Sequence, residues 1–401
     1  MRAEEMKKDE DDRKFMRQAL ALAARGRGMT HPNPMVGAVV VKDGTVVGKG
    51  YHKGPFTPHA EAAAISDAGK AASGADLYVT LEPCNHHGRT PPCTEAILGA
   101  GIKRVVIAAP DPNPGVRGGG AARLREAGLR VEEGLLAEEA SRLNSAYEKL
   151  VRSGRPLVLL KVAATADGKI AAKGGASRWI TGEAARIEVH RMRRESDAVM
   201  VGRGTVQADD PELTVRLVPL RGARPPLRVV VDSRLSIDLG CRLAQGGEPG
   251  VIVAADEAHD EEKARILRAR GVEVLVLPRD EAGRVDLEEL LLALGERGVA
   301  QLLVEGGPKL AGSLLRHGLV DRVAIFLSGK VFGAAEARSW VEGCVVQDPS
   351  RALRLRWERV RRVGHDLLLE AERDRDVACG PDAPLAREGE KEGTRTCSPV
   401  S

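Results

Sequence analysis

Four side chains in two short stretches of the sequence have the chemistry of a catalytic zinc site. His59 and Glu61 lie in "PHAEAAA", and Cys84 and Cys93 lie in "TLEPCNHHGRTPPC". A catalytic zinc ion takes three protein ligands and keeps a fourth position for water. One histidine and two cysteines supply that number. We therefore predict His59, Cys84 and Cys93 as metal ligands and Glu61 as the catalytic residue.

The position of Glu61 suits proton transfer. Zinc lowers the pKa of its bound water to roughly 7, and a neighbouring carboxylate can take a proton from that water and return it to a leaving amine. Base deaminases carry His-x-Glu and Pro-Cys-x-x-Cys; here eight residues separate the two cysteines instead of two. The alternative interpretation is that the cysteines are unrelated core thiols and that His59 is a surface imidazole.

The hydrophobic pattern around these residues predicts alternating helices and strands. In chain order we expect a helix over 15–26, a hairpin over 36–50, a helix over 60–69, a strand over 76–81, a helix from Cys93, a strand over 104–109, and helices over 119–127 and 136–152. Gly154 and Pro156 interrupt the last helix and mark a domain boundary. The first domain is predicted over 13–150, and residues 1–12 are expected to be disordered.

A second α/β domain is predicted over 156–372. Its strands are expected near "LVLLKVAA", "AVMVG", "LRVVVD", "GVIVAA", "VEVLVL", "QLLVEGG" and "RVAIFL", with a closing hairpin over 353–372. The tail over 374–401 mixes Pro, Gly and charge without an apolar period, which is typical of disorder.

Composition disfavours several classes of protein. The 61 basic and 57 acidic residues leave a net charge of +4, and aromatic residues make up 2% of the chain, so neither nucleic acid nor an anionic membrane is expected as a partner. No run of eighteen apolar residues occurs, and the charged N-terminus does not resemble a signal peptide. The six cysteines are too few and too irregular for a disulfide scaffold, which favours a cytoplasmic location.

Three stretches of the second domain suggest a binding site. In "LLVEGGPKLAGSLL" a strand ends at Glu305 and Pro308 suits the first position of a helix whose N-terminus can bind phosphate. "KVAATADGKIA" carries Lys161, which either reaches a phosphate or pairs with a carboxylate. "VGRGTVQADDPELTVR" places a turn at 202–204 before Asp209 and Asp210. If this segment is extended, only one of those two carboxylates faces the site, and Asp210 is expected to be a cap or a turn residue.

The motifs "THPNPMVGAVVVKDG", "TLEPCNHHGRTPPC" and "DPNPGVRGGG" resemble the deaminase half of the bifunctional deaminase-reductase family of riboflavin biosynthesis. The eight-residue insertion between the cysteines is itself a mark of that family, and Asn85 stands where the family pattern has Ser. The three stretches of the second domain resemble the reductase half. The resemblance implies a cytidine-deaminase-like α/β/α sandwich followed by a dihydrofolate-reductase-like α/β domain.

The resemblance also implies two reactions and their cofactors. With Zn²⁺, 2,5-diamino-6-(5-phosphoribosylamino)pyrimidin-4-one is deaminated; with NADPH, the ribosyl group is then reduced to ribityl. The implied deaminase substrate contacts are Asn33, His52, Asp111 and Asn113. The implied NADP contacts are Ala163, Trp179, Thr205, Asp209, Ser233, Gly307, Pro308, Lys309, Leu310, Ala311, Gly312 and Ser313. The implied reductase substrate contacts are Ser177, Arg193, Leu213, Arg216 and Glu305.

Each of these assignments has a structural alternative. Asn33 and the "DPNPG" segment are also typical of turns, and Arg193 lies in "HRMRRESD", where a solvated helix face would carry the same charges. A guanidinium group binds phosphate in a bidentate manner, which favours Arg193 and Arg216 as phosphate ligands.

Two other functions remain open from the sequence. One is a nucleoside or tRNA-base deaminase with an unrelated C-terminal domain; a tRNA-base deaminase would present a basic, aromatic-rich face. The other is a non-catalytic protein with a structural zinc ion, which would need a fourth protein ligand. By resemblance, we expect the chain to form a homo-oligomer.

Overall fold

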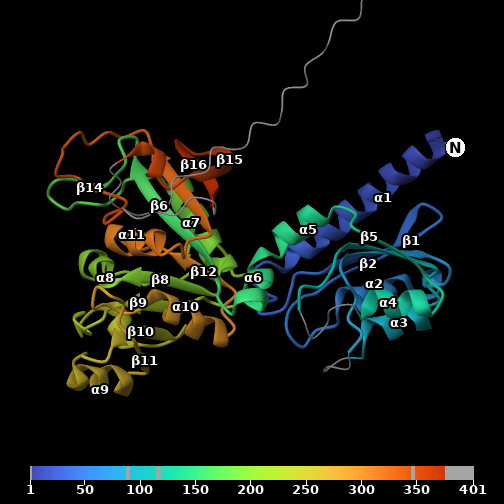
Figure 1. Cartoon of the computed structure of the whole chain (residues 1–401), viewed down its shortest axis with the longest axis horizontal. Helices are drawn as coiled ribbons and strands as arrows, with labels where there is room; N and C mark the ends of the chain where they lie inside the picture. The colour runs from blue at the N-terminus through green and yellow to red at the C-terminus, as the bar shows by residue number, and fades with distance from the viewer. Residues whose placement is uncertain (1, 87–90, 114–118, 345–347, 375–401) are drawn as a thin grey trace, which may run out of the picture.

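The chain folds into two α/β domains that lie side by side and meet near helix α6 (Ser145–Ser153), as Figure 1 shows. This computed structural model describes residues 2–86, 91–113, 119–344 and 348–374. The predicted tail over 374–401 lies outside these ranges except for Asp374. Gly154 ends α6 with a φ of 68°, a left-handed conformation that favours glycine. The second domain then begins with β6 (Leu157–Thr165).

The N-terminal domain is built on a five-stranded sheet in the order β2-β1-β3-β4-β5. The strands are β1 (Gly37–Lys42), β2 (Thr45–Tyr51), β3 (Asp76–Leu81), β4 (Arg104–Ala109) and β5 (Arg130–Glu133). β1 is antiparallel to β2 and β3, and the other pairs are parallel. Alternate residues of β1 face opposite cores, with Val39 and Val41 on one side and Ala38 and Val40 on the other.

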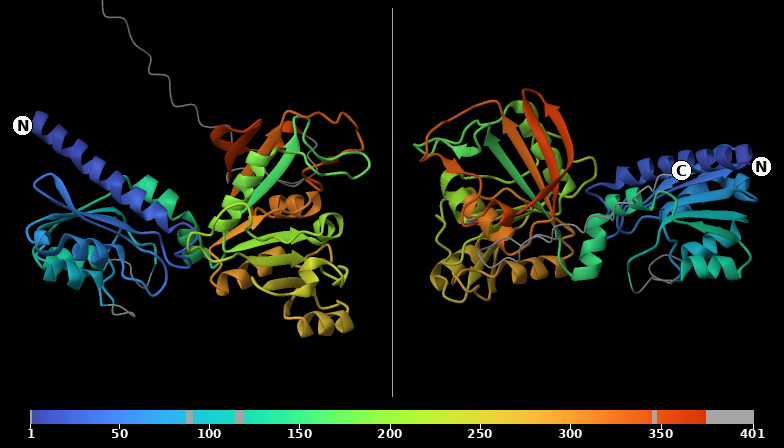
Figure 2. Two further views of the ribbon diagram at one scale, coloured as in Figure 1. Left: turned by 180° about the vertical axis from the view of Figure 1, so that it is seen from behind. Right: turned by 45° about the horizontal axis from the view of Figure 1, so that its top comes forward.

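Helices cover both faces of this sheet, which confirms the expected three-layer sandwich. The helices are α1 (Arg2–Ala23), α2 (Ala60–Ala68), α3 (Cys93–Gly99), α4 (Gly120–Glu126) and α5 (Ala137–Leu143). Residues of α1 and α5 pack in one core, and residues of α2, α3 and α4 pack in the other. Figure 2 shows α1 running past the sheet as a single long helix.

The prediction of disorder over residues 1–12 is wrong for residues 2–12, which belong to α1. The helix is anchored at Asp12, whose side chain is buried and accepts hydrogen bonds from Arg104 at 3.0 and 2.5 Å and from the hydroxyl of Tyr78. A partner 92 residues away in the sequence therefore fixes a segment whose own composition is typical of a solvated terminus.

The helix predicted over 136–152 is two helices, α5 and α6, which meet at Asn144. The Asn144 side chain is buried, accepts a hydrogen bond from the Met35 backbone N–H at 2.8 Å and donates one to the Met35 carbonyl at 2.9 Å. Strand β5 has no counterpart among the predicted elements.

The C-terminal domain contains a nine-stranded sheet in the order β11-β10-β9-β8-β12-β6-β13-β16-β15. The strands after β6 are β8 (Ala198–Gly202), β9 (Leu227–Val231), β10 (Val251–Asp256), β11 (Val272–Leu277), β12 (Gln301–Val304), β13 (Arg322–Ser328), β15 (Leu355–Val363) and β16 (Asp366–Arg373). The pairs from β11 to β13 are parallel, and the final hairpin is antiparallel. The predicted strands are thus present.

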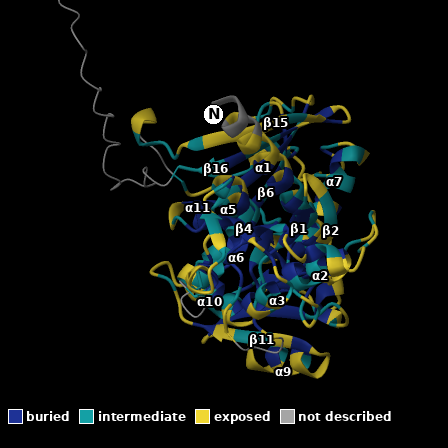
Figure 3. Ribbon diagram, turned by 90° about the vertical axis from the view of Figure 1, so that its right-hand side faces the viewer, coloured by how far each residue is buried: buried dark blue, intermediate teal, exposed yellow. Residues whose placement is uncertain are grey.

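Helices lie on both faces of this sheet as well. They are α7 (Glu183–Glu195), α8 (Arg203–Asp209), α9 (Glu261–Ala269), α10 (Leu287–Glu296) and α11 (Pro308–Arg316). α10 and α11 pack on one face and α9 on the other; Figure 3 shows buried strands and a largely exposed α9. A small sheet of β7 (Lys169–Ala171) and β14 (Arg338–Ser339), absent from the predictions, lies beside it. None of the helices in the described ranges combines the length and hydropathy that crossing a bilayer requires.

Replacing Asp12 with Ala should lower the free energy of unfolding of the N-terminal domain by about 2 kcal/mol. Breaking a buried ion pair typically costs about 3–5 kcal/mol, but Arg104 keeps Glu132 and Asp76 as partners. Denaturant unfolding followed by circular dichroism measures the change. Asp9→Ala is the control, because its pair with Arg13 is exposed and should contribute less than about 0.5 kcal/mol. Equal stability of the two variants would contradict the proposed anchor.

Candidate metal centre and nucleotide cavity

The structure brings His59, Cys84 and Cys93 together. Their ligand atoms all lie within 4.8 Å of one another, and among the described residues this is the group suited to holding a metal ion. His59 is the N-cap of α2, Cys93 is the first residue of α3, and Cys84 follows β3. Three structural elements within 35 residues of sequence therefore present one nitrogen and two sulfur atoms to the same point.

The spacing of these atoms fits a tetrahedral zinc ion. The Nδ1 atom of His59 lies 3.2 Å from the Cys93 sulfur and 3.5 Å from the Cys84 sulfur. Zinc bonds of about 2.3 Å to sulfur and 2.0–2.1 Å to nitrogen at tetrahedral angles place those atoms roughly 3.5 Å apart. His59, Cys84 and Cys93 can thus hold zinc with little movement and leave one position for another ligand.

The electrostatics of the cluster favour a thiolate at Cys84. Hydrogen bonds from Cys93 and His59 lower the pKa of Cys84 to about 4. The same hydrogen bond to Cys84, together with burial, raises the pKa of Cys93, and the bond with the Cys84 thiolate raises the pKa of His59. The cluster therefore concentrates negative charge on sulfur, which suits a divalent cation.

Glu61 lies in the first turn of α2 with a side chain that is buried beside the cluster. Burial raises the pKa of Glu61 to about 7, and its carboxyl group interacts with the Cys93 thiol. A carboxyl group that titrates near neutral pH can take up and release a proton within one reaction cycle.

Two of the predicted substrate contacts, Asn33 and His52, lie on the His59 side of the metal cluster, and His52 contacts His59 directly. The side-chain amide of Asn33 is 3.3 Å from Nε2 of His52, and the His52 ring meets the His59 ring edge-on with 5.6 Å between centroids. Burial lowers the pKa of His52, so the imidazole is neutral at pH 7. Neutral polar groups of this kind can form hydrogen bonds with a heterocyclic base.

Asp111 and Asn113 lie on the segment that follows β4. The Asp111 side chain accepts hydrogen bonds from the Tyr147 hydroxyl and from the Asn113 backbone N–H, both at 2.9 Å. Burial raises the pKa of Asp111, and the nearby charges of Glu82 and Cys84 raise it further. Asp111 is therefore near the metal cluster. His87, Arg89 and residues 114–118 of the predicted motifs lie outside the described residues.

Glu82 is absent from the predicted site residues, yet its side chain connects two segments beside the metal cluster. Its buried carboxylate accepts a hydrogen bond from the Ala121 backbone N–H at 3.0 Å and lies 3.5 Å from the Asp111 backbone nitrogen. Its position two residues before Cys84 in "TLEPC" is the signal that would have pointed to it.

The C-terminal domain contains a cavity of about 1520 Å³ at the carboxyl ends of its central parallel strands. Open α/β sheets bind ligands at such strand ends. The cavity is larger than the roughly 300–1,000 Å³ typical of a single small-molecule site. It therefore has room for a dinucleotide together with a second ligand.

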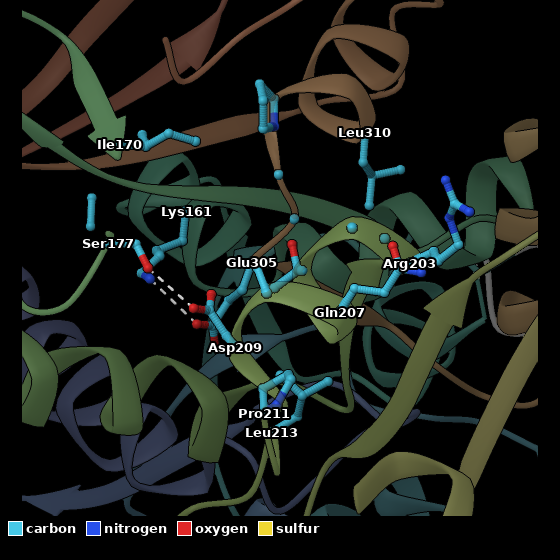
Figure 4. A pocket seen from close by; sticks show the side chains of 18 of the residues that line it. Lys161, Ile170, Ser177, Arg203, Gln207, Asp209, Pro211, Leu213, Glu305 and Leu310 are labelled. Carbon is cyan, nitrogen blue, oxygen red and sulfur yellow. Dashed lines mark hydrogen bonds and ion pairs between the residues drawn. The ribbon is translucent and has the colours of Figure 1, made fainter. Parts of the chain in front are cut away.

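Nearly all of the residues predicted for the second site line this cavity. They are Ala163, Ser177, Trp179, Arg193, Thr205, Asp209, Leu213, Arg216, Ser233, Glu305, Gly307, Pro308, Lys309, Leu310 and Ser313. Figure 4 shows Lys161, Ser177, Asp209 and Glu305 on one side of the cavity and Arg203 and Gln207 on the other. The fold thus brings predicted residues from segments that span 150 sequence positions into the lining of one cavity.

Ala311 and Gly312 are the exceptions. Ala311 packs in the core below α11, and a Cβ atom on Gly312 would lie 1.7 Å from the carbonyl oxygen of Glu342. Both residues face the protein interior because they lie on the far side of a helix that presents only its N-terminus and one face to the cavity. Their predicted contact with NADP is corrected accordingly.

Glu305 joins two basic side chains at the end of β12. Its carboxylate accepts hydrogen bonds from Arg193 at 2.6 and 3.2 Å and from Lys161 at 3.3 Å. Burial alone would raise the pKa of Glu305, but the charges and hydrogen bonds of Arg193 and Lys161 lower it to about 2. Arg193 is therefore a buried partner of Glu305 and does not lie on a solvated helix face.

His190 also lines the cavity and was missed by the sequence analysis. Its Nδ1 atom accepts a hydrogen bond from the Arg216 backbone N–H at 3.0 Å. Burial and the positive charges of Arg193, Arg216 and Lys161 lower the pKa of His190 to about 4. The neutral ring therefore fixes the backbone of Arg216, whose side chain is half exposed and pairs with Glu212.

The turn predicted to bind phosphate, before Pro308, and the turn predicted at 202–204 both begin helices at the cavity. Gly307 is the N-cap of α11, with Pro308 at its first turn, and Gly202 is the N-cap of α8. Free backbone N–H groups at helix N-termini favour anionic phosphate groups. The segment after Gly202 is helical and not extended, so Asp209 lies in α8 and accepts a hydrogen bond from Ser177 at 3.1 Å. Asp210 caps the helix in a left-handed conformation, as expected.

Comparison with known proteins follows this division into two domains. Residues 9–109 match the model for the cytidine and deoxycytidylate deaminase zinc-binding region, and residues 156–369 match the RibD C-terminal domain. The riboflavin biosynthesis protein RibD of Aquifex aeolicus is 43% identical and is aligned over 90% of this chain and 98% of its own. RibD of Escherichia coli is 41% identical, with 89% of this chain and 98% of that protein covered.

The chain belongs to the RibD family.

Solved structures agree with this assignment. A crystal structure of Acinetobacter baumannii RibD superimposes with a TM-score of 0.83 at 37% identity, covering 92% of this chain and all of that one. A Thermotoga maritima structure has a TM-score of 0.79 at 39% identity and covers 91% of this chain and 99% of that one. That protein is described as a diaminohydroxyphosphoribosylaminopyrimidine deaminase and 5-amino-6-(5-phosphoribosylamino)uracil reductase.

Family membership confirms the expected two-domain enzyme of riboflavin biosynthesis, with a deaminase domain and a reductase domain. Zinc is the metal of the deaminase region, and NADPH is the cofactor of the reductase domain family. The alternative of an unrelated C-terminal domain is thereby overturned, because the RibD C-terminal model matches that half of the chain.

Proposed function

We propose that this chain deaminates 2,5-diamino-6-(5-phosphoribosylamino)pyrimidin-4-one at the cluster of His59, Cys84 and Cys93 and then reduces the ribosyl group of the product at the C-terminal cavity. The observation that carries this proposal is the presence of two separately built sites in one chain: a three-ligand cluster beside a buried carboxylate, and a large cavity with helix N-termini and a basic cluster.

In the deaminase domain, each side chain has a distinct proposed role. Zinc, when bound by the three ligands, acts as a Lewis acid and lowers the pKa of a water molecule to about 7. Glu61 takes a proton from the attacking water and delivers it to the departing amino group, which leaves as ammonia. Asn33 and His52 hold the pyrimidine ring by hydrogen bonds, and Asp111 and Asn113 line the entrance.

In the reductase domain, NADPH bound in the cavity would supply a hydride to the sugar carbon that bears the amino group. The bond between that carbon and the ring oxygen breaks, and the ring oxygen takes up a proton to become a hydroxyl group. Gly307 and the first turn of α11 bind the phosphates of the cofactor. Arg216 binds the phosphate of the substrate, because its guanidinium is half exposed at the cavity. Arg193 and Glu305 form a rigid pair that shapes the substrate end of the cavity.

Self-association and a cytoplasmic location belong to this proposal as well. Both are motivated by the sequence and by the resemblance to the family. Size-exclusion chromatography with light scattering measures the first, and fractionation of the source cells measures the second.

Glu61→Gln should slow ammonia release at least about 100-fold, since general acid-base catalysis contributes about 10²–10⁴. Zinc content should stay unchanged, and so should NADPH oxidation with 5-amino-6-(5-phosphoribosylamino)uracil. Glu95→Gln is a matched control: Glu95 follows Cys93 by two residues, as Glu61 follows His59, but its side chain is exposed. Full ammonia release by the Glu61 variant would refute the assigned role and favour another base or a structural metal.

His190→Leu should raise the KM for 5-amino-6-(5-phosphoribosylamino)uracil about tenfold with little change in kcat. The variant lacks the acceptor that fixes the backbone of Arg216. His190→Asn should stay within threefold of the wild type, because the Asn carbonyl can accept the same hydrogen bond. Steady-state NADPH oxidation measures both, and equal KM values for the two variants would contradict the role of the acceptor.

Acid should also weaken the C-terminal domain through His190. The pKa of this group is lowered from 6.5 to about 4 in the folded state, so the unfolded chain binds more protons between those values. The stabilisation by neutral His190 is therefore present above pH 6.5 and is lost as the pH falls toward about 4. As the pH falls across this range, the melting temperature should decrease more steeply for the wild type than for His190→Asn. Thermal unfolding followed by circular dichroism measures the difference.

A further inference from the structure

One loop of the deaminase domain, residues 27–35, lies against the reductase domain. A Cβ atom on Gly28 would lie 2.3 Å from the Arg194 carbonyl oxygen, so the two backbones are in close contact. Gly28 has a φ of 71°, which further favours glycine. Met29 packs near Gly222, and Pro32 packs near Gly298. The outer side of the loop is thus covered by three segments of the other domain.

A buried hydrogen bond lies at the centre of this contact. The Nδ1 atom of His31 is 3.0 and 2.9 Å from the two carboxylate oxygens of Asp197, and the His31 side chain is 7% exposed. Asp197 is itself fixed, because it accepts the backbone N–H groups of Ala300 and Gln301 at 2.9 Å each. The His31 imidazole is therefore bonded to a carboxylate whose own position is fixed by the backbone of the reductase domain.

The inner side of the same loop reaches the metal cluster. Asn33, two residues after His31, hydrogen-bonds with His52, and the His52 ring contacts the ring of the metal ligand His59. Met35 is fixed by two hydrogen bonds with Asn144. Of the side-chain hydrogen bonds described here for this loop, the one at His31 joins the loop to the reductase domain, and it lies two residues before Asn33.

Asp197 is also linked through the chain to residues of the reductase site. It follows Arg193 of α7 by four residues, and its partner Gln301 is the first residue of β12, which ends just before Glu305. Arg193 and Glu305 form the buried ion pair of the cavity. One carboxylate therefore braces the elements that carry this pair and the loop that carries Asn33.

We propose that His31 is a positioning residue for deamination: its hydrogen bond to Asp197 lets the reductase domain hold the loop that presents Asn33 to the pyrimidine. This inference rests on the proposed function, in which Asn33 contacts the substrate. The expected consequence is that the deaminase site needs the reductase domain for substrate binding and not for the chemical step.

The test compares full-length, zinc-loaded variants at His31. His31→Leu introduces an apolar side chain of similar size that has no donor, whereas the Asn side-chain amide in His31→Asn can donate a hydrogen bond to Asp197. Ammonia release should show a KM for the diaminopyrimidinone about tenfold higher in His31→Leu and within threefold of the wild type in His31→Asn. Zinc content and NADPH oxidation with the deaminated substrate should not change in either. Arg27→Ala, which removes an exposed 3.8 Å pair at the same interface, is the control and should behave as the wild type.

Hydrogen exchange provides a second readout that needs no turnover. Backbone amides over 30–35 should exchange faster in His31→Leu than in the wild type or Arg27→Ala. An unchanged KM and unchanged exchange in His31→Leu would overturn the proposal, and so would equal losses of zinc, ammonia release and NADPH oxidation, which indicate a general folding defect. If the wild type releases no ammonia from this pyrimidine, the proposed function fails, while faster exchange over 30–35 still supports the positioning contact.

Discussion

The close approach of helix α2 to strand β2 is the constraint on which the metal centre depends. A Cβ atom on Gly50 would lie 2.2 Å from the Ala60 carbonyl oxygen, and one on Gly48 would lie 2.2 Å from that of Ala64. These two glycines let the helix lie directly on the sheet. His59, the N-cap residue of that helix, then lies beside Cys84, which follows β3, and Cys93, which begins α3. Two glycines, which have no side chain to hold the helix away from the sheet, thus determine where the ligand nitrogen of His59 lies.

In the reductase domain, several positively charged side chains lie close together at the cavity. Its cavity gathers Lys161, Arg193 and Arg216 near one end, and like charges at such short range repel. Glu305 pairs with Lys161 and Arg193, and His190, whose pKa the three positive charges help to lower, adds no further charge at neutral pH. The side chain of Arg216 remains half exposed beside the cavity. Glu305 thus neutralises charge in the buried part of the site, whereas the Arg216 side chain, which pairs with Glu212, is half exposed where we propose that the substrate phosphate binds.

Local patterns in the sequence were sufficient to predict most of the architecture. The turn at Asp43 and Gly44, the end of α6 at Gly154 and the strand that ends before Glu305 all depend on neighbouring residues. The predictions failed where a distant partner decides the outcome. Asp12 is buried by Arg104, Asn144 breaks a helix because it bonds with Met35, and Gly312 faces inward because it packs on Glu342. His190 was missed because a lone histidine on an Arg-rich helix has no local signal of burial.

The coordination of the bound metal tests the central claim most directly. X-ray absorption spectroscopy at the zinc edge of the full-length protein should show two sulfur ligands at about 2.3 Å and two nitrogen or oxygen ligands at about 2.0–2.1 Å. His59, Cys84 and Cys93 account for three of these, and the remaining light atom occupies the position left for water. A shell of three or four sulfur ligands, or a protein purified and reconstituted without retaining zinc, would contradict the account.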